Sequence, residues 1–147
     1  MEGDKPLSIL LVEDDGAARE ILASVLVLKF PQIVFHVADN GKTGLECFDK
    51  HASAIVITDV NMPVMDGLRM ARGIKSIMAD VKMIVLTAFS DKSILETTAA
   101  DGIGIDHYIL KPVDYEKLFA VIEQCLAEVA TGHGRITPKW RDNEKAQ

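Results

Sequence analysis

The stretch Ile9-Leu10-Leu11-Val12-Glu13-Asp14-Asp15 decides the fold class, because four consecutive apolar residues end abruptly in three acidic ones. A short apolar run without alternating polar residues is typical of a strand buried on both faces. Four further runs follow along the chain: Ile33-Val34-Phe35, Ala54-Ile55-Val56-Ile57, Met83-Ile84-Val85-Leu86 and Tyr108-Ile109-Leu110. We therefore predict five buried strands.

Amphipathic helices are predicted between and after these strands. The clearest apolar stripes with helical spacing run through residues 17–26, 70–78 and 118–129. Capping side chains predict further helix starts at Asn40, at Ser90-Asp91 and at Asp114. Five strands alternating with five helices predict an α/β fold. The leading topology is a doubly wound, five-stranded parallel sheet of order 2-1-3-4-5, which is the flavodoxin-like arrangement.

The length of 147 residues predicts one domain. We assign it to residues 6–130 and interpret 131–147 as a polar C-terminal tail or truncated linker, because Thr131-Gly132-His133-Gly134 interrupts the last helix. A net charge of −6 argues against direct nucleic-acid binding. No leader or membrane-spanning run is apparent. Cys47 and Cys125 form no zinc-like pattern and are expected to be reduced thiols, which fits a cytoplasmic protein.

Polar residues follow four of the five strands. Glu13 and Asp14 follow the first strand, Asp59 the third, Thr87-Ala88 the end of the fourth and Lys111 the fifth. Because the carboxyl ends of parallel strands share one edge of the sheet, we expect these side chains to meet in one cleft.

A magnesium site is predicted there. Several carboxylates this close repel one another, and a divalent cation relieves the repulsion. Mg²⁺ prefers oxygen ligands and keeps several waters. Asp14, Asp59 and the backbone carbonyl of Asn61 are the candidate ligands, and Glu13 can hold a metal-bound water.

The same constellation suits phosphoryl transfer to a carboxylate. Asp59 would be the nucleophile, Lys111 would neutralise charge, and the Thr87 hydroxyl and the Ala88 N–H would donate hydrogen bonds. Taken alone, each piece has an ordinary explanation, such as a solvated acidic loop or a surface turn. Their order along the chain is what favours the chemistry.

The motifs resemble those of response regulator receiver domains from two-component signal transduction. Residues 9–15 with Arg19 resemble the first strand and acidic turn of the family, and Asp59-Val60-Asn61-Met62-Pro63-Val64-Met65-Asp66-Gly67 resembles its phosphoacceptor segment. Thr87-Ala88 and Tyr108 to Pro112 resemble its other two signatures. The resemblance covers nearly the whole chain.

The resemblance implies that Asp59 is the phosphoacceptor, with Glu13 and Asp14 as the acidic pair of a Mg²⁺ site. It also implies that Asn61 and Ala88 contact the phosphoryl group. Thr87 becomes a switch hydroxyl and Lys111 the lysine of the family, joined to Pro112 by a cis peptide bond. Tyr108 stands where the family has a switching aromatic residue, although a plain core role is equally open.

The resemblance also implies partners. The phosphoryl donor would be a histidine kinase or a histidine phosphotransfer protein. The output would pass through the face made by the fourth helix, fifth strand and fifth helix, with a homodimer through that face left open. Such a domain takes part only in its own phosphorylation and dephosphorylation and is otherwise not an enzyme.

Two alternative functions fit the sequence less well. A Mg²⁺-dependent aspartyl-phosphate hydrolase needs a second aspartate two residues after the nucleophile, where this chain has Asn61. A flavin-binding module of the same sheet order would not carry acidic residues at 13–15, since they repel a phosphate. The histidines, at positions 36, 51, 107 and 133, show no metal-ligand spacing. The output pathway stays open.

Overall fold

The computed structural model describes residues 7–88 and 102–131. Its elements are β1 (Ser8–Val12), α1 (Gly16–Lys29), β2 (Val34–Ala38), α2 (Gly41–His51), β3 (Ile55–Asp59), α3 (Gly67–Ile77), β4 (Lys82–Thr87), β5 (His107–Leu110) and α5 (Tyr115–Thr131). The predicted fourth helix with its Ser90-Asp91 cap, and residues 132–147 of the predicted tail, lie outside the described residues.

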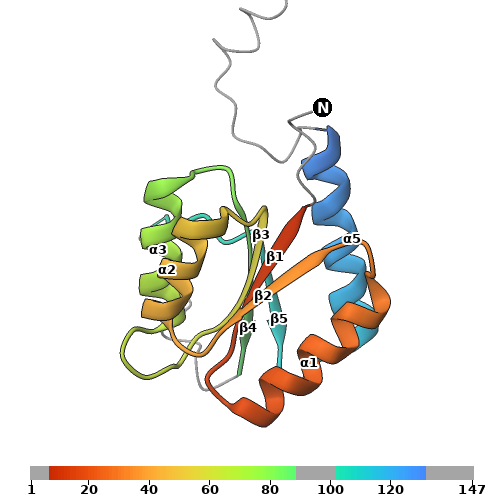
Figure 1. Ribbon diagram of the computed structural model, residues 1–147, viewed down its shortest axis with the longest axis horizontal. Helices are drawn as coiled ribbons and strands as arrows, with labels where there is room; N and C mark the ends of the chain where they lie inside the picture. The colour runs from red at the N-terminus through yellow and green to blue at the C-terminus, as the bar shows by residue number, and fades with distance from the viewer. Residues whose placement is uncertain (1–6, 89–101, 132–147) are drawn as a thin grey trace, which may run out of the picture.

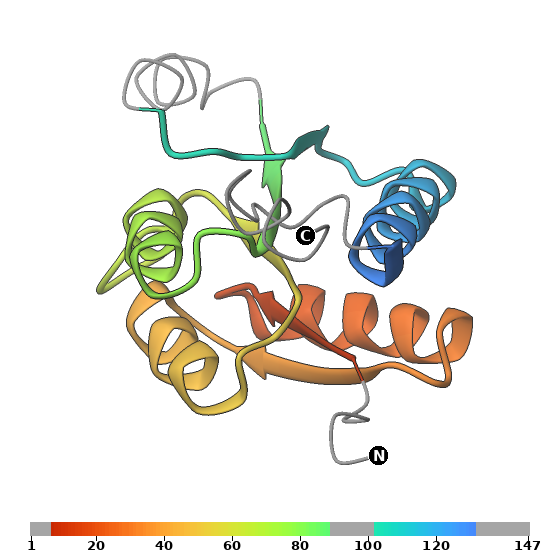
Figure 2. The same cartoon turned by 90° about the horizontal axis from the view of Figure 1, so that it is seen from above.

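The five strands form one sheet in the order β2-β1-β3-β4-β5, and all four strand pairs are parallel. Helices α2 and α3 lie against one face, and α1 and α5 lie against the other (Figures 1 and 2). The predicted fold class, a doubly wound α/β sheet of order 2-1-3-4-5, is therefore confirmed.

The sheet divides the core in two, since side chains alternate between its faces. In β3, Val56 packs on the side of α2 and α3, while Ile55 and Ile57 pack on the side of α1 and α5, and all three are fully buried. Burial on both faces is the reason for the continuous apolar runs. The exceptions are the two edge strands, since Val34 and Val37 of β2 are 41% and 49% exposed and Tyr108 and Leu110 of β5 are 40% and 43% exposed.

Side-chain caps begin the helices where the sequence predicts them. Asn40 caps α2: its side chain accepts from the Thr43 N–H at 2.9 Å, and the Asn40 N–H donates to the Thr43 hydroxyl at 3.2 Å. Asp114 accepts from the Glu116 N–H at 3.0 Å at the start of α5. Both predicted helix starts are confirmed.

The apolar stripe of α1 is wider than the face that packs on the sheet. Leu22 and Leu26 are buried, whereas Ile21 is 57% exposed. The exposed part of the stripe faces away from the core, so periodicity alone overstates how much apolar surface this helix buries.

Within residues 7–88 and 102–131, every helix is too short or too polar to span a membrane.

Candidate functional site

Three carboxylates meet at the carboxyl edge of the sheet. Glu13 directly follows β1, Asp14 is next to it, and Asp59 is the last residue of β3. One oxygen from each lies within 4.8 Å of the others. Glu13 and Asp59 are only 5% and 8% exposed, whereas Asp14 is open to solvent. The neighbouring strands β1 and β3 thus bring together residues that are 45 positions apart.

Lys111 supplies the positive charge of this cluster. Its Nζ lies 2.6 Å from Asp59 Oδ1 and 3.8 Å from Glu13 Oε1. Burial on its own would lower the pKa of the Lys111 ammonium, but the hydrogen bond to Asp59 and the charges of Asp59, Glu13 and Asp14 raise it above its ordinary value. Lys111 therefore stays charged at neutral pH. The Lys111–Pro112 bond is cis, as the resemblance implies.

Glu13 is held from its own loop. Its Oε2 accepts from the Asp15 N–H at 3.0 Å, and its backbone carbonyl accepts from Arg19 Nη1 at 2.8 Å. Burial raises the pKa of the Glu13 carboxyl, the nearby charge of Asp59 raises it further, and the bond from Asp15 opposes both. Burial and the neighbouring negative charge thus disfavour ionisation of Glu13, which is part of the electrostatic cost that the sequence predicts.

The loop after β3 lies close to the Asp59 backbone because Gly67 has no side chain at the point of contact. A Cβ on Gly67 would lie 1.9 Å from the Asp59 carbonyl oxygen, so no other residue fits there without a backbone shift. The Gly67 N–H donates to the Val60 carbonyl at 2.8 Å, and Asp66 caps α3 by accepting from the Arg69 N–H at 2.8 Å. Asn61 lies exposed in the same loop.

Thr87 ends β4 beside Lys111. The Lys111 N–H donates to the Thr87 carbonyl at 2.6 Å, and the buried Thr87 hydroxyl donates to the Ala88 carbonyl at 3.2 Å. Tyr108 lies in the middle of β5, paired with Val85 of β4, and is 40% exposed. Its exposure does not fit a plain core residue.

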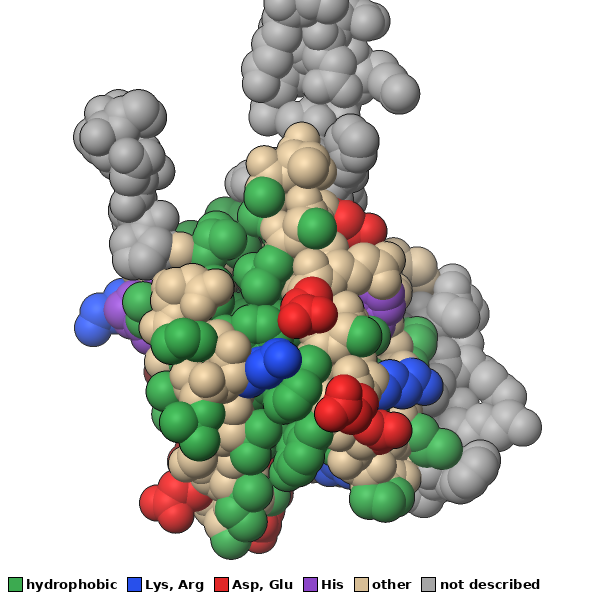
Figure 3. All heavy atoms as spheres, turned by 90° about the vertical axis from the view of Figure 1, so that its right-hand side faces the viewer, with side chains coloured by type: hydrophobic (Ala, Val, Ile, Leu, Met, Phe, Trp, Pro, Cys, Tyr) green, Lys and Arg blue, Asp and Glu red, His purple; other side chains and the backbone are tan. Residues whose placement is uncertain are grey.

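An apolar pocket adjoins the charged cluster. It has a volume of about 370 Å³ and lies between α1 and the segment that links β5 to α5. Its lining residues are Glu13, Ala18, Ile21, Leu22, Leu86, Lys111, Pro112, Val113 and Tyr115. Figure 3 shows the side of the molecule that carries α1 and α5, where hydrophobic side chains gather in a band between charged ones. The exposed Ile21 thus belongs to a surface next to the site.

The donor set suits a hard divalent cation. Three carboxylates with one exposed member fit an ion that binds oxygen and keeps several waters, as Mg²⁺ does. Receiver domains generally bind Mg²⁺ at an acidic pocket of this kind. Glu13, Asp14 and Asp59 are the residues here that would hold it.

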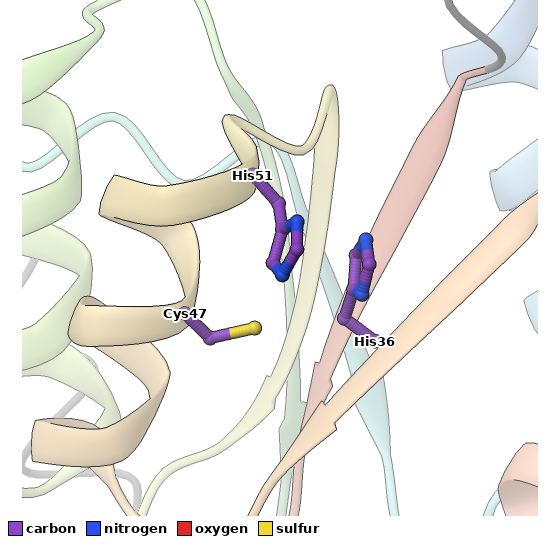
Figure 4. A group of neighbouring side chains, drawn as sticks. All are labelled: His36, Cys47 and His51. Carbon is purple, nitrogen blue, oxygen red and sulfur yellow. The ribbon is translucent and has the colours of Figure 1, made fainter.

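The structure also assigns roles that the sequence analysis missed. Asp15, to which the sequence analysis gave no role of its own, caps α1 by accepting from the Ala18 N–H at 2.8 Å. The histidines show no ligand spacing in sequence, yet the rings of His36 and His51 stack, and Cys47 lies beside them (Figure 4). Cys47 and His51 are four residues apart on α2, and that spacing was the available signal.

Comparisons with known proteins agree with this geometry. Residues 9–123 match the family model described as "Response regulator receiver domain". The chain is 33% identical over 133 residues to "Response regulator MprA" from Mycobacterium sp. (strain KMS), covering 90% of this chain and 56% of that protein. It is 31% identical over 130 residues to "Probable transcriptional regulator ycf27" from Cyanidium caldarium, covering 88% of this chain and 50% of that protein. The chain thus spans about half the length of these relatives.

Solved structures agree on the fold. The N-terminal domain of an uncharacterized protein from Wolinella succinogenes superposes with a TM-score of 0.77 at 32% identity, covering 86% of this chain and 98% of that one. A CheY-like receiver domain protein from Methanospirillum hungatei superposes with a TM-score of 0.74 over 87% of this chain and 99% of its own, and at 23% identity it supports the fold alone. With the family model matched over most of its length, this chain belongs to the response regulator receiver domain family of two-component systems.

Proposed function

We propose that this receiver domain accepts a phosphoryl group on Asp59, from a histidine kinase or a histidine phosphotransfer protein, in a Mg²⁺-dependent reaction. The observation that carries the proposal is the 2.6 Å contact between Lys111 Nζ and Asp59 Oδ1 inside a cluster of three carboxylates. The ammonium group is already in place beside the buried carboxylate, so it can neutralise the negative charge that a phosphoryl group adds.

The Asp59 carboxylate acts as the nucleophile. A bond forms from its oxygen to phosphorus while the bond between phosphorus and the donor imidazole nitrogen breaks, and that nitrogen keeps the electron pair. When bound, Mg²⁺ supplies positive charge to the phosphoryl oxygens. Glu13, Asp14, Asp59 and the Asn61 carbonyl would hold the ion. Lys111 stays protonated and pairs with a phosphoryl oxygen.

Thr87 and Tyr108 form the switch in this proposal. The Thr87 hydroxyl now donates to the Ala88 carbonyl, and rotation about its Cα–Cβ bond would let it donate to a phosphoryl oxygen instead. The Ala88 N–H would donate to the same group. Movement of Thr87 makes room for the half-exposed Tyr108 to turn inward, which biases a two-state element.

The output face in this proposal includes β5. Tyr108 and Leu110 are 40% and 43% exposed on the same side of this edge strand. A change at Tyr108 would therefore alter a surface that already carries apolar side chains, and such a surface suits a protein partner or a second copy. We do not expect direct binding to nucleic acid or a membrane, because the net charge of the whole chain is −6.

The phosphoryl donor docks, in this proposal, on the apolar pocket between α1 and the segment after β5. The pocket shares Glu13 and Lys111 with the charged cluster and adds Ile21, Pro112 and Val113 as apolar contacts. A donor seated there would have its histidine next to Asp59. Activity beyond the domain's own phosphorylation and dephosphorylation is not expected, because Asn61 occupies the position where a hydrolase of this type needs an acid.

Phosphorylation by a small-molecule donor tests the proposal. Acetyl phosphate or phosphoramidate with Mg²⁺ should add one phosphoryl group to the protein, measured by intact mass. Asp59→Asn should abolish the addition while the circular dichroism spectrum stays unchanged. Asp49→Asn, an exposed position on α2, is the matched control and should be modified at the normal rate. Modification of Asp59→Asn at the wild-type rate would show that Asp59 is not the acceptor.

Magnesium dependence has its own test. Backbone amide NMR signals of Asp14, Asp59 and Asn61 should shift on titration with Mg²⁺ in the micromolar-to-millimolar range, and a chelator should stop phosphorylation. Unchanged spectra at about 10 mM Mg²⁺, well above the range expected for a site with few carboxylates, would contradict the metal site.

A further inference from the structure

A second group of metal-ligating side chains lies away from the phosphoacceptor cluster, between β2 and α2. His36 lies on β2, and Cys47 and His51 lie on α2 (Figure 4). The two imidazole rings stack with their centroids 3.8 Å apart and their planes 11° apart. One ligand atom from each residue lies within 4.8 Å of the other two. We propose that His36, Cys47 and His51 form a zinc site that joins the edge strand to α2.

The helix geometry supports the proposal. Cys47 and His51 are four residues apart and therefore project from the same face of α2. That face packs against the side of the sheet that His36 occupies, since His36 pairs with Leu10 of β1 and Leu10 belongs to the core beneath α2 and α3. Strand pairing and helix packing together bring the three ligands into one place.

Zinc binding would require a small movement of the three side chains. A tetrahedral zinc ion bound to nitrogen and sulfur keeps its ligand atoms roughly 3.3–3.6 Å apart. With ligand atoms at most 4.8 Å apart, the contraction needed is up to about 1.5 Å, which side-chain rotation can supply. An imidazole lone pair lies in the ring plane, so the two nearly parallel rings must also tilt. All three side chains are partly exposed, which leaves room for the tilt.

The chemistry of the ligands selects the ion. Two imidazoles and one thiolate suit a borderline-soft ion such as Zn²⁺, whereas Mg²⁺ requires oxygen ligands. Three protein ligands leave the fourth position to water.

The site is separate from the proposed phosphoryl chemistry. It shares no residue with Glu13, Asp14 and Asp59, and its ligands come from β2 and α2 rather than from the carboxyl edge of the sheet. Zinc would tie the exposed edge strand to the helix beside it, and so stabilise the folded state by mass action.

The test is Zn²⁺ binding by tag-free, reduced protein, measured by calorimetry with Mg²⁺ present throughout to occupy the carboxylates. We expect one ion per chain, a dissociation constant on the order of micromolar or tighter, and a higher Tm with zinc. Cys47→Ser and His51→Gln should each weaken binding by at least about 10-fold. His107→Gln, a strand histidine outside the cluster, is the matched control and should bind normally, as should Asp59→Asn.

Cobalt adds a second readout. Co²⁺ in the wild-type protein should give a thiolate-to-cobalt charge-transfer band that Cys47→Ser lacks. Circular dichroism without metal checks that each variant is folded. A missing charge-transfer band, or equal zinc affinity in wild type and Cys47→Ser, would overturn the proposal. Loss of zinc binding in Asp59→Asn instead would assign the ion to the carboxylates and would overturn it equally.

Discussion

Strands β4 and β5 have a lysine cluster at each end, and the two clusters differ in charge balance. At the amino end, Lys82 Nζ lies 2.8 Å from Glu128 Oε1 and 3.7 Å from Asp106 Oδ1. The Met83 N–H donates to the other oxygen of Asp106 at 2.8 Å. Lys75 adds a second ammonium near Asp106, with its Nζ bonded to the Val81 carbonyl at 2.8 Å. Two ammonium groups thus meet three carboxylates, since Asp80 also lies near Lys75.

At the carboxyl end, Lys111 is the cation that forms ion pairs with Glu13 and Asp59, and Asp14 adds a third carboxylate, so negative charge is in excess there. The carboxyl pKa values at the two ends are shifted in opposite directions. The hydrogen bond from Lys82 lowers the pKa of Glu128, whereas burial raises the pKa of Glu13. The ion pairs of the amino-end cluster tie α5 to the sheet, whereas the larger excess of negative charge at the carboxyl end carries an electrostatic cost that a cation can relieve.

The largest expected difference between the two clusters is in phosphoryl uptake. Lys111→Met should slow phosphorylation by acetyl phosphate about 100-fold or more, because it removes the charge that stabilises the transferring group. Lys82→Met should stay within about 2-fold of wild type, because it lies at the opposite end of the strands. Rates come from intact mass against time. Equal slowing in both variants would mean that the clusters do not differ in function.

Lys82 is expected to matter for the free energy of unfolding, although it should not matter for phosphorylation. Lys82→Met should lower the free energy of unfolding by about 2 kcal/mol, because Glu128 and Asp106 lose their ammonium partner. Lys42→Met, an exposed position on α2, is the control and should change it by less than about 0.5 kcal/mol. Urea denaturation followed by circular dichroism measures both. A loss for Lys82→Met no greater than for the control would contradict a structural role.

Glu13→Gln should stabilise the protein at pH 7, in the presence of a chelator, by up to about 1 kcal/mol. The reason is that it removes a buried charge from a cluster with excess negative charge. Since the pKa of Glu13 is raised above its ordinary 4.5, the folded state binds the extra proton, and wild-type stability falls as pH rises between 4.5 and that raised pKa. The gain should therefore vanish below pH 4.5 and shrink in Mg²⁺. A loss of stability at pH 7 in chelator would be the contrary result.

The smallest effect is expected at Glu128, whose side chain is 33% exposed. Glu128→Gln should cost about 0.5 kcal/mol at pH 7, as partly solvated ion pairs do. Because the pKa of Glu128 lies below 4.5, its contribution is present above pH 4.5 and is lost as pH falls through the lowered value. Urea melts of wild type and Glu128→Gln should converge in acid, and a difference that grows there would refute the ion pair.

Much of the fold and the candidate site could be predicted from the chain because the informative features are local. Burial on both faces makes a strand such as Ile55 to Asp59 largely apolar, and the residue that ends it is then recognisable as polar. Parallel strands connected by right-handed crossovers have few topologies. Glu13, Asp59 and Lys111 could therefore be assigned to one edge of the sheet from their positions along the chain.

Other features depend on tertiary contacts that no local sequence pattern predicts. Periodicity finds the apolar stripe of α1 but not that Ile21 would remain exposed beside a pocket. No sequence pattern near Lys82 predicts its ion pair with Glu128, which is 46 residues away on α5.

By itself, the sequence determined the order of strands and helices, the helix starts at Asn40 and Asp114, and the residues at the carboxyl edge of the sheet. Only the tertiary structure decided that His36 stacks on His51 beside Cys47, and that Lys82 lies between Asp106 and Glu128. The physical reason is that helix periodicity, capping and strand burial act between neighbours in the chain. Contacts between β2 and α2, or between β4 and α5, depend on strand register and on how each helix rotates as it packs on the sheet.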